Sequence, residues 1–119
     1  MKHIKKLTLA ACLMAAAGNA WSGSDFITAN VDRLLTTSDS AFGGCMAKLD
    51  VAIGSTGLDC RGTWVTFSCT GDFASRQDAK INFEMVQLAF AMGKQIRVVA
   101  DDSRKHNDYC FSERVYVFQ

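Results

Sequence analysis

Proline is absent from all 119 residues, and the motifs of the commonest enzyme and metal sites are missing too. No two cysteines are spaced as Cys-x-x-Cys, so neither a zinc ribbon nor a dithiol redox site is indicated. The sequence contains no nucleophile elbow and no glycine-rich phosphate-binding loop. We therefore expect a protein that is not an enzyme, with no catalytic residues, no metal and no cofactor.

The sequence also has no excess of positive charge, and no long apolar run beyond its first 20 residues. Beyond residue 20 there are ten basic and twelve acidic side chains, a net charge of −2 with histidine neutral. This charge does not favour binding to nucleic acid. No segment beyond residue 20 is long and apolar enough to cross a membrane. We expect no nucleic-acid partner and no transmembrane segment.

The first 20 residues have the pattern of an export signal. Three lysines among the first six residues precede an uncharged, mostly apolar run over 7–18, and Gly18-Asn19-Ala20 supplies the small residues that a signal peptidase requires. We predict a signal peptide over 1–20 and an exported domain, periplasmic or secreted, over 21–119. An alternative is a lipoprotein box at Leu9-Ala10-Ala11-Cys12, which would make Cys12 the lipidated first residue.

Four cysteines follow this leader, and an even count in an exported chain indicates two disulfides. Three pairings of Cys45, Cys60, Cys69 and Cys110 exist. A bond between Cys60 and Cys69 is disfavoured, because a strand over 63–69 would hold the two residues apart. We predict Cys45–Cys69 across a hairpin and Cys60–Cys110 to the last strand, each stabilising the small domain by about 2–4 kcal/mol.

A helix is predicted over residues 75–92, beginning at the capping serine Ser75 and ending at Gly93. Two apolar stripes follow the helical period, one of Ala79, Phe83, Val86 and Phe90 and the other of Ile81, Met85, Leu88 and Met92. One stripe is expected to face the sheet of this chain. The other faces another subunit, unless the whole helix is sunk in one core.

Strands are predicted over residues 27–36, 45–53, 63–69, 95–100 and 113–118. The first could also be a helix, but its threonines and its lack of strong helix formers favour a strand. Three strands, one helix and two strands fit a mostly β fold, the five-stranded Greek-key barrel called the OB-fold, in which the helix lies between the third and fourth strands.

The polar segment over 101–107 is predicted to be a loop between the last two strands, where an OB-fold commonly contacts ligands. Asp102, Arg104 and Asn107 offer hydrogen-bonding groups to a sugar, Tyr109 offers an aromatic face, and His106 lies among them. These five residues are the predicted ligand-binding site. A hydrolase that uses His106 with a serine and an aspartate, and a calcium site at Asp101, Asp102 and Asp108, are the less favoured alternatives.

Four short motifs resemble the B subunits of AB5 toxins, above all the subtilase-cytotoxin type, and their small secreted relatives. They are Gly44-Cys45-Met46, Phe67-Ser68-Cys69, the run Ala91-Met92-Gly93-Lys94-Gln95-Ile96-Arg97-Val98, and Tyr109-Cys110-Phe111, and the likeness covers residues 43–118. Cys60 and the tract over 101–108 depart from the family pattern. The resemblance implies an OB-fold, a homo-oligomeric ring with helices about its axis, and a glycan-binding face.

Taken together, these patterns predict a small exported binding protein with a glycan as its partner. The alternative is a periplasmic protein-interaction or inhibitor protein of the same fold, which would cover another exported protein with its barrel face.

Overall fold

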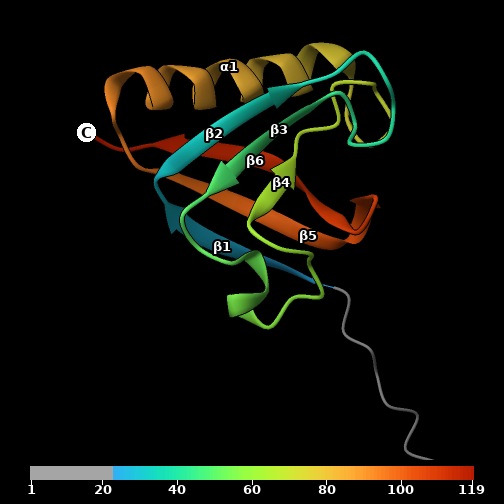
Figure 1. Cartoon of the computed structure of the whole chain (residues 1–119), viewed down its shortest axis with the longest axis horizontal. Coiled ribbons are helices and arrows are strands. Elements are labelled where there is room, and N and C mark those ends of the chain that lie inside the picture. Colours follow the sequence, from blue (N-terminus) through green and yellow to red (C-terminus); the bar gives the residue numbers. More distant parts are fainter. Residues whose placement is uncertain (1–22) are drawn as a thin grey trace, which may run out of the picture.

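The computed structural model describes residues 23–119, so the predicted signal peptide and Cys12 lie outside it. The chain is mostly β with one α-helix (Figure 1). Its elements are β1 (Ser24–Ala29), β2 (Val31–Thr36), β3 (Cys45–Leu49), the 3₁₀ turn η1 (Ile53–Thr56), β4 (Trp64–Thr66), α1 (Arg76–Met92), β5 (Ile96–His106) and β6 (Tyr109–Val117).

The six strands form one mixed sheet in the order β1-β5-β6-β4-β3-β2. All neighbours are antiparallel except β4 and β6, which run parallel. The prediction of one strand over 27–36 is therefore wrong in one respect. This segment belongs to two strands, β1 and β2, which lie at opposite ends of the sheet order. Only Asn30 separates them, and Asp50 holds it in place. The amide and the side-chain Nδ2 of Asn30 each donate to the Asp50 carboxylate, both at 2.9 Å.

The predicted loop over residues 101–107 is also wrong. β5 continues to His106, and only Asn107 and Asp108 form the turn into β6, both with positive φ. Charged side chains of β5 are paired: Arg104 pairs with Asp101 and Glu113 in the sheet, and Lys105 pairs with Asp59 in the loop before β4. The strand predicted over 45–53 is shorter in the structure: β3 ends at Leu49, and Ile53 begins η1.

Helix α1 has the predicted caps. The Ser75 hydroxyl accepts from the amide of Asp78 at 3.1 Å, and Gly93 takes the left-handed conformation at the other end. Within residues 23–119, no helix has the length and apolar character that crossing a bilayer requires.

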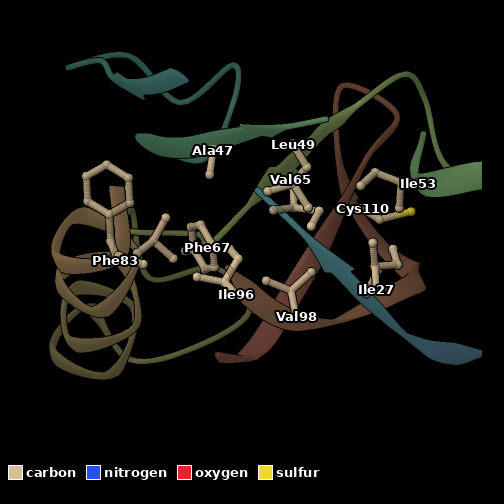
Figure 2. Packing of buried hydrophobic residues seen from close by; sticks show 14 of the residues in the cluster. Ile27, Ala47, Leu49, Ile53, Val65, Phe67, Phe83, Ile96, Val98 and Cys110 are labelled. Carbon is tan, nitrogen blue, oxygen red and sulfur yellow. The ribbon is translucent and has the colours of Figure 1, made fainter. Parts of the chain in front are cut away.

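The core occupies the space between the curved sheet and α1. The members of this cluster alternate along β3, as Cys45, Ala47 and Leu49 do, whereas Met46 is buried on the opposite face. Figure 2 shows it extending from Phe83 of α1, whose ring centroid lies 6.0 Å from that of Phe67, to Ile53 and Cys110. The helix buries Ala79, Phe83, Val86 and Ala89. Phe90, expected in this stripe, is instead 46% exposed, because the small side chain of Ala89 takes the core position in the last turn.

Both predicted disulfides are confirmed. Cys45 bonds to Cys69 with a Cα–Cα distance of 5.6 Å, and Cys60 bonds to Cys110 with a distance of 5.4 Å. The first ties β3 to the segment before α1, and the second ties the β3–β4 connection to β6.

Candidate functional site

An aromatic pocket of about 170 Å³ opens on the face of β2, β3 and β4 that points away from the core. Its lining residues come from four strands and one loop and are Leu35, Phe42, Met46, Trp64 and Tyr109. We refer to these five as the aromatic pocket.

Strand alternation explains why these side chains meet. Leu35 and Met46 are partners across β2 and β3, so they share a face of the sheet. Trp64 reaches the same face from β4, while its neighbour Val65 points into the core and is fully buried. Phe67, which follows β4, is buried in the core, whereas Trp64 is partly exposed.

Two loops close the pocket. Phe42, in the β2–β3 loop, packs edge-on against Tyr109 at the start of β6, with ring centroids 5.9 Å apart. The guanidinium carbon of Arg61 lies 5.0 Å from the Tyr109 centroid, a cation–π distance. Lys48, the cross-strand partner of Trp64, is bonded to Asp32 at 3.4 Å. The pocket thus has apolar walls, with the Arg61 guanidinium against the Tyr109 ring and Lys48 paired with a carboxylate beside it.

The five predicted site residues do not form one site. Tyr109 lines the aromatic pocket, and Asn107 lies exposed in the adjoining turn. Asp102 is used elsewhere, because its carboxylate accepts from the amide of Gly23 at 2.7 Å and from that of Asp59 at 3.1 Å. It therefore anchors the start of β1 and the loop before β4.

Arg104 lines a second and larger cleft, of about 400 Å³, which lies between α1 and the β5–β6 hairpin. Its guanidinium stacks over Phe111 at 4.6 Å and donates to Asp101 and Glu113 at 2.9 and 3.1 Å. Partial burial alone would raise the pKa of Asp101, but hydrogen bonds from Ser103 and Arg104 outweigh it and hold that pKa below its usual range. The same pairing raises the pKa of Arg104 against the effect of its burial. Arg104 is therefore a fixed, paired cation.

His106 lies in a largely buried cluster. Its Nε2 is 3.0 Å from the hydroxyl of Ser68 and 3.6 Å from a carboxylate oxygen of Asp72, and its ring packs on Phe73 at 4.6 Å. A serine–histidine–aspartate relay needs the serine and the aspartate on different ring nitrogens, whereas here both approach Nε2. Ser68 is also fully buried, and its oxygen accepts from the amide of Phe73 at 3.2 Å. The geometry fits a link between β5 and the segment before α1.

Sequence reasoning did not include Leu35, Phe42, Met46 or Trp64 among the predicted ligand-binding residues. The aromatic residues were visible in the sequence, but their convergence depends on the pairing of β2, β3 and β4, which no local pattern reveals. Among residues 23–119, no group of three or more histidine, cysteine, aspartate or glutamate side chains is arranged as a metal site. The three aspartates of the calcium alternative are not gathered: Asp101 and Asp102 have the partners given above.

Comparison of the chain with protein-family models, with curated proteins and with solved structures finds no match.

Proposed function

We propose that this chain is an exported OB-fold protein that binds a glycan at the aromatic pocket. The fold assignment is supported by the connections of the sheet. β1 and β2 together act as one bent first strand, which pairs with β3 at one end and with β5 at the other. The helix lies between β4 and β5, and β4 and β6 are parallel, as the order of an OB-fold requires.

The convergence of three aromatic rings on one pocket carries the glycan proposal. Sugar rings present C–H faces that pack on aromatic side chains, and the polar tips of tyrosine and tryptophan bond to hydroxyl groups. The pocket lies on the strand face and against the two loops with which OB-folds bind oligosaccharides. Its volume of about 170 Å³ is well below the roughly 300–1,000 Å³ of pockets that enclose drug-sized ligands. It therefore suits one terminal sugar of a longer glycan.

A glycan array with the folded, disulfide-bonded protein is the direct test, followed by calorimetric titration with the best hit. Tyr109→Ala and Trp64→Ala should each weaken binding by roughly two- to tenfold, the loss expected for an aromatic contact of about 0.5–1.5 kcal/mol. Tyr116→Ala is the matched control, because Tyr116 is also an exposed aromatic residue but lies on a different face. An array with no signal above background, or equal losses in all three variants, would contradict the proposal.

The outer face of β1, β5 and β6 supports a second candidate, binding to another exported protein. Phe26, Tyr116 and Phe118 are exposed there, and the guanidinium of Arg97 lies 5.8 Å from the Phe26 ring and 5.2 Å from the Phe118 ring. Aromatic residues and arginine are enriched at protein interfaces. A purified partner whose affinity falls with Phe26→Ser but not with Tyr109→Ala would establish this candidate.

A further inference from the structure

The exposed stripe of α1 has the spacing of a helix–helix seam. Ile81, Met85, Leu88 and Met92 follow one another at intervals of four, three and four residues. Their exposed fractions are 50, 37, 52 and 58%. Apolar residues that recur every 3.5 residues form the contact line between two packed helices. In Figure 1, α1 lies at the edge of the molecule, with the sheet on one side of it and no element on the other.

The two ends of this stripe carry opposite charges. Asp78 lies three residues before Ile81, and Lys94 lies two residues after Met92. Neither forms an ion pair among residues 23–119. Asp78 lies in the wall of the 400 Å³ cleft together with Glu113, whereas Arg104 of that cleft is already paired with Asp101 and Glu113. The start of α1 on this side is therefore acidic and hollowed, and the half-buried Lys94, just past the C-cap Gly93, places a basic group beyond its other end.

A surface of this kind is complementary to itself in one orientation only. We propose that a second copy of this chain packs its α1 antiparallel against this one, about a two-fold axis between Met85 and Leu88. Ile81 then meets Met92 of the second copy, and Lys94 of the second copy reaches the cleft beside Asp78. A parallel arrangement would instead bring Asp78 against Asp78 and Lys94 against Lys94. Two-fold pairs of this type use one patch twice and close without forming a ring.

A zero-length carbodiimide cross-link between Asp78 and Lys94 tests this orientation directly. Within one chain these residues lie at opposite ends of α1, about 20 Å apart at 1.5 Å per residue, so a direct amide bond between them must join two molecules. Mixing ¹⁵N-labelled with unlabelled protein before cross-linking should give mixed-isotope Asp78–Lys94 peptides in the mass spectrum. A pair without this cross-link, or a ring of more than two copies, would overturn the antiparallel assignment.

Charge exchange tests the same contact by affinity, measured by analytical ultracentrifugation. Asp78→Lys should weaken the dimer several-fold, since exposed ion pairs contribute modestly and each dimer contains two of them. Lys94→Asp should do the same, and the double variant Asp78→Lys with Lys94→Asp should restore the wild-type constant. A double variant as weak as the two single variants combined would contradict the pairing.

Leu88→Ser tests the apolar part of the seam, and Phe90→Ser is its control, because Phe90 is exposed on the same helix but outside the stripe. Leu88→Ser should raise the dissociation constant at least tenfold, whereas Phe90→Ser should leave it within about twofold. Wild-type protein that stays monomeric up to roughly 100 µM would contradict the proposal, because a dissociation constant above that value is too weak for a functional pair. Glycan binding at the aromatic pocket is a separate measurement and would survive that result.

Discussion

At the scale of single residues, Gly43 is the glycine of the described chain with the least space for a side chain. Its φ is +74°, and a Cβ added there would lie 2.6 Å from both the Cδ2 atom of His106 and the hydroxyl of Thr66. Both of these side chains are held by other contacts. We therefore expect Gly43→Ala to lower the free energy of unfolding by about 2–4 kcal/mol, the combined effect of a strained backbone and an overpacked site. Urea unfolding measures this loss.

Gly57→Ala is the control for this prediction. Gly57 also has a positive φ, +92°, but a Cβ there meets no atom within 4 Å. Only the backbone strain remains, so the expected loss is about 1 kcal/mol. Similar losses at the two glycines would show that the contacts with His106 and Thr66 relax easily, and that Gly43 is needed only for its backbone conformation.

At the scale of elements, the joint between β1 and β2 depends on Asp50. Besides the two bonds that its carboxylate accepts from Asn30, the Asp50 amide donates to the Asn30 carbonyl at 3.1 Å. The hydrogen bond from the Asn30 side chain, and then that from its amide, hold the pKa of Asp50 below its usual range. The joint is thus stabilised by the ionised carboxylate.

Asp50→Ala should loosen this joint by about 1 kcal/mol, since the site is exposed and water replaces part of the lost bonding. Because the folded pKa is lowered, the contribution is fully present above the ordinary aspartate pKa of about 4 and is lost as the pH falls through the lower folded value. Hydrogen exchange at the Asn30 amide should accelerate in Asp50→Ala at neutral pH. Asp32→Ala, which removes only a surface pair with Lys48, should leave that amide unchanged.

The helix was predictable in detail because its signals are local. Ser75, Gly93 and the apolar period each act within a few residues; both caps agree with the structure, and so does the buried stripe except at Phe90. The break at Asn30 was not predictable, because alternation continues across it and only its bonds to Asp50, 20 residues away, mark the joint. The polar segment of β5 has the composition of a loop for a related reason: its strand pairing and the bond of Lys105 to Asp59, 46 residues away, leave no local pattern.

At the scale of the whole molecule, the candidate site is harder to predict than the fold. Tyr109 was singled out for its place next to the last turn, and it does line the aromatic pocket. Its companions Phe42 and Trp64 come from other segments, and only the order of strands in the sheet brings them together. Polar residues near Tyr109 suggested one continuous site, whereas the hairpin directs Arg104 and Asp102 to separate places. Composition can suggest a ligand, but topology decides which residues meet it.

The two disulfides should differ in their effect on global stability. Cys45–Cys69 spans 24 residues and Cys60–Cys110 spans 50. Chain entropy then predicts that replacing both cysteines of a pair by alanine lowers the free energy of unfolding by about 3.4 kcal/mol for the first and about 4.1 kcal/mol for the second. In a domain this small, loss of Cys60–Cys110 should bring the chain closest to unfolding at 37 °C. Denaturant titration of the two double variants measures both losses, and a larger loss for Cys45→Ala with Cys69→Ala would show that native packing around that bond outweighs loop length.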